Sequence, residues 1–98
     1  MFAILNYMEV TIMDIANAVR QRIINIAKKK NIKIHKLTMN AGVPYSTVSS
    51  FLNGKSNSLT ISTILHLCEG ADMSLGEFFD DPLFNNVTAK RKGLTYKI

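Results

Sequence analysis

Side chains that can bind a phosphate or the edge of a nucleobase gather between positions 35 and 55 of the chain. Hydroxyl and amide groups can both donate and accept hydrogen bonds, and a lysine can neutralise a negative charge. The candidates are His35, Lys36, Tyr45, Ser46, Ser49, Ser50, Asn53 and Lys55. A set of this kind suits the binding of an anionic partner better than it suits bond-making chemistry.

Residues that could carry catalysis or hold a metal are few and poorly spaced. The two histidines, His35 and His66, have no acid or cysteine at the spacing of a triad or a metal site, and there is no glycine-rich phosphate loop. The single cysteine, Cys68, excludes an internal disulfide, and its apolar helical surroundings favour a place in the core. We therefore expect no enzymatic activity, no cofactor, no metal and no small-molecule ligand.

Two short helices joined by a tight turn must position the candidate residues. Leu37 and Ala41 are four apart, so they share one face of a first helix. Gly42 follows where the helix must end, because glycine adopts the left-handed conformation without cost. Val43 can fill the corner, and Pro44 fits only at the entry to a second helix, where a missing amide proton is tolerated.

The second helix has an apolar face and a polar face. Val48, Phe51 and Leu52 fall at i, i+3 and i+4 and predict the buried side. The opposite face carries the polar residues Tyr45, Ser46, Ser49, Ser50 and Asn53. This pattern predicts a helix that packs on one side and offers hydroxyl groups on the other.

This spacing resembles the helix-turn-helix of the lambda-repressor-like family, also called XRE and Cro, of bacterial and phage DNA-binding proteins. The matching positions are Leu37, Thr38, Gly42, Val43, Val48, Phe51 and the closing Asn53-Gly54-Lys55. The resemblance covers roughly residues 14 to 84 and implies an all-α fold of five helices. Two positions depart from the family pattern: Lys33 replaces a common Ser or Thr cap, and Ile34 replaces a glutamine that touches phosphate in many members.

The resemblance also implies roles for the candidate residues. The second helix of the motif is expected to enter the major groove of double-stranded DNA, with Tyr45, Ser46 and Ser50 at the positions that most often contact bases and Ser49 beside them. Because serine hydroxyls discriminate poorly between bases, we expect modest direct readout supplemented by DNA shape. Phosphate contacts are expected from His35 and Lys36 before the turn, and from Asn53 and Lys55 after the second helix.

Charge is sorted along the chain, whose net charge is +5. Eight basic residues and no acidic ones lie between Arg20 and Lys55, whereas five acidic residues and no basic ones lie between Glu69 and Asp81. One end of the fold should therefore be positive and carry the motif. Three lysines of this block also have a structural explanation. Lys28, Lys29 and Lys30 suit the last turn of a helix, where the helix dipole is negative.

Three further helices are expected around the motif. The first begins at Asp14 as N-cap, runs to about Lys30 and exits through a left-handed Asn31. The fourth is capped by Thr60, and its inward residues are expected to be Ile61, Ile64, Leu65 and Cys68. Ser74 and Glu77 have the spacing of a capping box for the fifth helix, which should close the core with Leu75, Phe78 and Phe79 and stop at Asp80-Asp81-Pro82.

The chain of 98 residues divides into an N-terminal extension (1–13), one helical domain (14–84) and a basic C-terminal tail (85–98). The extension could be an added strand, part of the first helix or a dimer contact. The tail could add phosphate contacts through Lys90, Arg91 and Lys92, or be merely a soluble tail. Its alternating Leu94, Tyr96 and Ile98 could pair with the N-terminus as a strand. With one cysteine and no membrane-spanning stretch, we expect a cytoplasmic protein.

Three classes of function compete. The first is a sequence-specific transcriptional regulator, most simply a repressor, that binds double-stranded DNA. It is expected to be a homodimer whose two copies contact each other through the fifth helix or the tails. The second is a protein-interaction module, for example an antitoxin-like partner, that uses the same fold. The third, an enzyme, has the least support from the residues.

Overall fold

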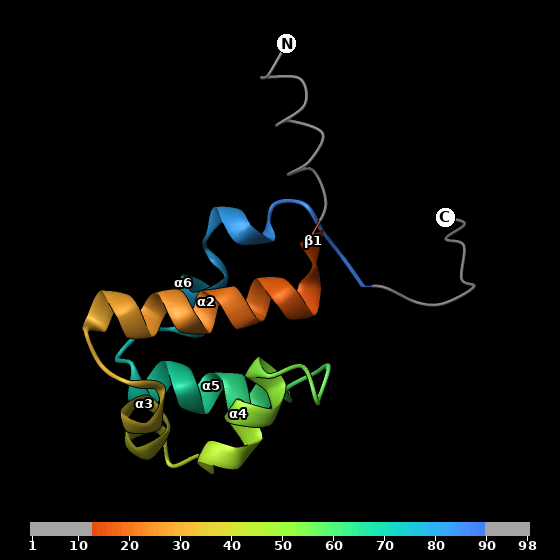
Figure 1. The fold of residues 1–98 in the computed structure, drawn as a ribbon. Helices are drawn as coiled ribbons and strands as arrows, with labels where there is room; N and C mark the ends of the chain where they lie inside the picture. The colour runs from red at the N-terminus through yellow and green to blue at the C-terminus, as the bar shows by residue number, and fades with distance from the viewer. Residues whose placement is uncertain (1–12, 90–98) are drawn as a thin grey trace.

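The computed structural model describes residues 13–89. Its helices are α2 (Ile15–Lys30), α3 (Ile34–Ala41), α4 (Tyr45–Leu52), α5 (Ile61–Gly70) and α6 (Leu75–Phe79), followed by a 3-10 turn, η1 (Pro82–Phe84). Two short strands, β1 (Met13–Asp14) and β2 (Val87–Thr88), flank the helices. In Figure 1, α3, α4 and α5 lie on one side of α2, and η1 lies on the other. The expected five-helix fold is confirmed, with a small sheet added to it.

The helix ends follow local chemistry. Asn31 and Gly42 end α2 and α3 in the left-handed conformation, with φ of 56° and 70°. The Thr60 hydroxyl accepts a hydrogen bond from the backbone N–H of Thr63 at 3.0 Å, as a capping residue should. Asp14 occupies the N-cap position of α2, but its side chain does not make the capping bond.

The capping box predicted for α6 is present. The backbone N–H of Ser74 donates to the Glu77 carboxylate at 2.7 Å, and the Glu77 N–H donates to the Ser74 hydroxyl at 3.0 Å. The Ser74 backbone N–H, and after it the Ser74 side chain, lower the pKa of Glu77, because hydrogen bonds to the carboxylate favour its ionised form. The box therefore starts α6 at the residue that the sequence indicated.

The core lies between α2 and the helices beneath it, and one helix faces it differently from the prediction. Ile64 and Cys68 of α5 are buried, but Ile61 is 73% exposed and Leu65 is 40% exposed. Leu67, absent from the predicted set, is buried instead. The inward face of α5 is centred on positions 64, 67, 68 and 71, so Ile61 and Leu65 lie on its flank. In α6, Phe78 is buried and Phe79 is 39% exposed, so the second of the two phenylalanines closes the core only in part.

Helices α3 and α5 approach each other closely at Gly70. A Cβ atom on Gly70 would lie 2.7 Å from the backbone nitrogen of Ala41 and 2.8 Å from its Cα. Thr38, on the same helix as Ala41, is buried, and its hydroxyl donates to the His35 carbonyl at 2.8 Å. The end of α3, and with it the turn into α4, is thus held against α5.

The strands β1 and β2 pair in parallel, with Met13 opposite Val87 and Asp14 opposite Thr88. The N–H of Met13 also donates to the Asn86 carbonyl at 2.9 Å. This sheet joins the residues that directly precede α2 to those that follow η1. The predicted pairing of residues 94–98 with the N-terminus lies outside the described residues.

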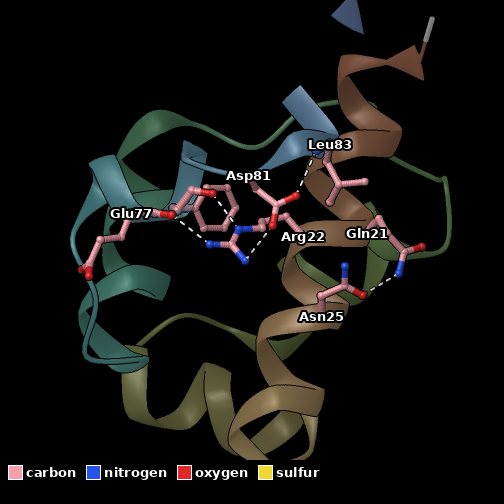
Figure 2. A network of polar contacts seen from close by, with 7 residues as sticks. Gln21, Arg22, Asn25, Glu77, Asp81 and Leu83 are labelled. Atoms are coloured by element: carbon pink, nitrogen blue, oxygen red, sulfur yellow. Dashed lines mark hydrogen bonds and ion pairs between the residues drawn. The ribbon is translucent and has the colours of Figure 1, made fainter. Parts of the chain in front are cut away.

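Arg22 fastens the C-terminal elements to α2. Figure 2 shows its guanidinium among Glu77, Phe78 and Asp81: Nε donates to the Phe78 carbonyl at 2.6 Å and Nη2 to the Glu77 carbonyl at 2.8 Å, while Nη1 lies 3.3 Å from the Asp81 carboxylate. Asp81 also caps η1 by accepting from the N–H of Leu83. Arg22 belongs to the basic block of the sequence, yet the structure places it against the acidic end of the fold.

Candidate nucleic-acid interface

The turn between α3 and α4 has the geometry that its residues predict. The N–H of Gly42 donates to the Met39 carbonyl at 3.2 Å, and the N–H of Val43 donates to the Thr38 carbonyl at 3.0 Å. The Val43 side chain is buried in the corner. Pro44 precedes the first residue of α4, so its missing N–H costs no helical hydrogen bond.

Helix α4 divides into the two faces expected from its sequence. Val48 and Phe51 are fully buried, whereas Tyr45 is 47% exposed. Ser46 and Asn53 are also exposed, and Ser49 and Ser50 are half-buried. The hydroxyl-bearing face is therefore open at its N-terminal half and partly covered in the second turn.

The starts of α3 and α4 lie together. The rings of His35 and Tyr45 are 5.2 Å apart between centroids and tilted by 54°. Lys36 and Ser46, which follow His35 and Tyr45 in the sequence, are also exposed. Four of the eight predicted site residues are thus brought to one place.

Both helix starts at this place lack a capping side chain. Lys33 and Pro44 hold the N-cap positions of α3 and α4, and neither makes a side-chain hydrogen bond to its helix. The first backbone N–H groups of a helix have no partner within the helix and carry the positive end of its dipole. At the start of α4 the N–H of Thr47 already donates to the Pro44 carbonyl at 3.1 Å. An anion such as phosphate could therefore be bound there only by the N–H groups that precede Thr47, and at α3 by those of its first turn.

Asn53 and Lys55 form a second group at the other end of α4. The Asn53 amide donates to the Ser49 hydroxyl at 3.3 Å, so one of its hydrogen bonds is used within the helix. The N–H of Lys55 donates to the Ser50 carbonyl at 2.9 Å, and Gly54 turns the chain with φ of 84°. The exposed Lys55 side chain is thus carried on a turn that folds back onto α4.

Sequence reasoning missed three residues near this surface. Thr47 is exposed in the first turn of α4, and its spacing of three from Ser50 could have placed it on the same side. Met39 is exposed on α3, where a polar residue would be ordinary. Arg20 had been counted only as a charge, but its guanidinium contacts the end of α4.

The described residues offer little for other chemistries. No three His, Cys, Asp or Glu side chains within residues 13–89 are grouped so that they could hold a metal ion. Burial raises the pKa of the Cys68 thiol; nearby Arg22 opposes this shift and Glu69 adds to it. In the same range, no helix is long and apolar enough to cross a membrane.

Comparison with known proteins identifies the family. The model of the Cro/C1-type HTH DNA-binding domain matches residues 22–82, more than half of the chain. Among solved structures, the chain is similar to the prophage Lp1 protein 11, with 30% sequence identity, a TM-score of 0.65 and coverage of 74% of this chain and 95% of that chain. No curated protein gives a significant match. The chain therefore belongs to the Cro/C1-type, or XRE, family of helix-turn-helix DNA-binding domains.

Proposed function

We propose that the protein is a sequence-specific transcriptional regulator that inserts α4 into the major groove of double-stranded DNA. The observation that carries this proposal is the exposed face of Tyr45 and Ser46 beside His35 and Lys36, on a domain of the Cro/C1 type. Repression is the simplest mode, because a bound domain can block polymerase by occupancy alone. A regulator of this kind works where the genome is, which places it in the cytoplasm.

Base contacts are assigned to the N-terminal half of α4. Tyr45 can pack its ring on a thymine methyl group, and Ser46 can donate to or accept from a base edge. Ser49 and Ser50 are half-buried, so they contribute only if the helix lies deep in the groove. With no arginine or glutamine on this face, sequence preference should depend strongly on DNA shape.

Phosphate contacts are assigned to both ends of the motif. The uncapped start of α3, with His35 and Lys36, would bind one phosphate group. Asn53 and Lys55 would bind the backbone on the far side of the groove. Two such anchors fix the register of α4 between them.

A homodimer would give the affinity that one recognition helix cannot. Two copies reading half-sites one helical turn apart, roughly 10 bp, would bind a palindrome. Three exposed apolar side chains are candidates for such a self-contact: Ile61 and Leu65 of α5, and Phe79 of α6. Exposed apolar side chains mark an interaction surface where they form one contiguous patch.

The test is selection of bound sequences from a random duplex pool, followed by fluorescence anisotropy with the enriched duplex over a range of salt. We expect an enriched palindrome and a steep loss of affinity as salt rises, because several phosphates are neutralised on binding. Ser46→Ala should reduce the preference for the enriched sequence, while Ser62→Ala, an exposed serine of α5, serves as the matched control. Absence of duplex binding at low salt would refute the regulator and favour a protein-interaction role.

A further inference from the structure

Arg20 of α2 bridges the last turn of α4 and the loop that follows it. Its Nε donates to the Phe51 carbonyl at 2.6 Å, and its Nη2 donates to the Ser56 carbonyl at 2.9 Å. The same Nη2 lies 3.4 Å from the Asn57 side-chain oxygen, and Nη1 donates to the Asn17 side chain at 2.6 Å. One guanidinium therefore contacts the last turn of α4, the middle of the loop and its own helix.

The position of this guanidinium suits a fixed role. The Phe51 carbonyl belongs to the last turn of α4, where carbonyl groups lack helical partners and the helix dipole is negative. The guanidinium carbon also lies 4.7 Å from the centroid of the buried Phe51 ring. A planar fork with donors on several sides can hold such a set of acceptors, which a lysine cannot do. The Arg20 side chain is thus occupied by the protein itself.

Lys55 lies between the two points that Arg20 holds. Its own N–H and that of Ser56 both donate to the Ser50 carbonyl, at 2.9 and 3.2 Å. The N–H of Gly54 donates to the same Phe51 carbonyl that Arg20 contacts. The turn from Asn53 to Ser56 is therefore fixed by α4 from one side and by α2 from the other.

We propose that Arg20 is a positioning residue for DNA binding: it holds the Asn53–Ser56 turn so that Lys55 meets a phosphate when α4 lies in the groove. This inference rests on the proposed function. A contact made by a fixed loop avoids the entropy loss of ordering that loop on binding. Without Arg20, the Lys55 ammonium would still be present, but it would no longer be held in place.

A double-mutant cycle tests the proposal by measuring duplex affinity and its salt dependence for Arg20→Met, Lys55→Ala and the double variant. Lys55→Ala should lower the slope of log K against log salt by about one in the wild-type background. In the Arg20→Met background it should lower the slope by much less, and its effect on affinity should shrink about threefold or more. Additive effects would overturn the proposal.

Arg22→Met is the matched control. Arg22 is also a partly buried arginine of α2 that binds backbone carbonyls, but those carbonyls belong to α6. Its cycle with Lys55→Ala should be additive. If both arginine variants couple equally to Lys55, Arg20 acts only through the general stability of the fold, and the proposal fails.

If Arg20→Met does not fold, amide hydrogen exchange of the Arg20→Lys variant provides the test instead. Faster exchange at Lys55 and Ser56, with unchanged exchange at buried Ile23, supports the proposal because only the loop has been released. Equal acceleration at Ile23 overturns it. Failure of the wild-type protein to bind any duplex would instead refute the proposed function, so the two failures are distinguishable.

Discussion

Replacing Gly70 by alanine tests whether the close packing of α3 on α5 sets the position of the motif. The new Cβ would lie 2.7, 2.8 and 2.9 Å from the backbone nitrogen, Cα and Cβ of Ala41, whereas ordinary contacts lie between 3.4 and 4 Å. Two of these three atoms belong to the backbone, so the helices must separate by roughly 0.5–1 Å, in a core that is packed as densely as a crystal. Overpacking of this kind costs about 1–3 kcal/mol.

The same substitution also stabilises the helix, and this gain must be subtracted from the cost of overpacking. Alanine is favoured over glycine within a helix by about 1 kcal/mol. The expected net loss is therefore about 0–2 kcal/mol, and each kcal/mol lowers the Tm of a domain of this size by about 4–8 °C. Thermal unfolding followed by circular dichroism measures it, and urea unfolding gives the free energy independently.

Gly76→Ala is the matched control within α6. A Cβ there would have the Ser74 hydroxyl at 3.8 Å as its nearest neighbour, which is an ordinary contact. Only the gain in helix propensity remains, so Tm should be unchanged or higher. If Gly70→Ala matched or exceeded the Tm of Gly76→Ala, the close approach of α3 and α5 described above would be wrong.

Further predictions concern single side chains. Ser46→Ala should change sequence preference without changing Tm, whereas Phe51→Ala should cost about 3–5 kcal/mol of stability; equal losses of Tm would contradict the two faces of α4. Glu77 has a pKa below its ordinary value of 4.5, so it stabilises the fold above that pH and the contribution is lost as pH falls through the lower folded-state pKa. Glu77→Gln should therefore flatten the fall of Tm with pH in acid, and an unchanged pH profile would refute this role of the capping box. The buried Cys68 thiol should react with a thiol reagent only after unfolding, and rapid labelling of the native protein would show that the core is open there. Leu65→Glu should shift the sedimentation of a dimer toward the monomer while leaving Tm of the monomer unchanged, and an unaltered dimer would exclude this side of α5 from the contact.

The ends of the helices could be predicted because single residues determine them. Asn31 and Gly42 adopt φ values that few other residues tolerate, and Ser74 and Glu77 form a box that depends only on their spacing. The polar and apolar faces of α4 could be predicted from the spacing of its residues, which is also a local property. Local chemistry of this kind needs no knowledge of the rest of the fold.

The orientation of α5 could not be predicted in the same way. Ile61, Leu65 and Leu67 are all large and apolar, so residue type alone does not decide which of them faces inward. The neighbouring helices decide it, and in the structure they cover Leu67 and leave Ile61 and Leu65 on the flank. The predicted inward face of α5 was therefore wrong because tertiary packing, and not residue type, decides which of these similar side chains is buried.

The charge pattern was predictive for lysines and misleading for arginines. The six lysines of the basic block are exposed in the structure: Lys28, Lys29, Lys30, Lys33, Lys36 and Lys55. Arg20 and Arg22 bind carbonyl groups 31 to 56 residues away in the sequence, which a count along the chain cannot reveal. A guanidinium can satisfy several fixed acceptors at once, whereas an ammonium is a compact, strongly hydrated charge that favours the surface.

This difference between exposed lysines and carbonyl-bound arginines predicts that the two residue types contribute to DNA binding in different ways. If lysines supply the attraction to phosphate, replacing one that lies at the interface should lower the salt dependence of binding by about one unit of slope. Arginine replacements should act differently: at Arg20 through the placement of Lys55, and at Arg22 through the docking of α6 and η1 on α2. An arginine variant that lowered the salt slope on its own, with Lys55 already removed, would show that its guanidinium leaves the carbonyl groups to meet phosphate.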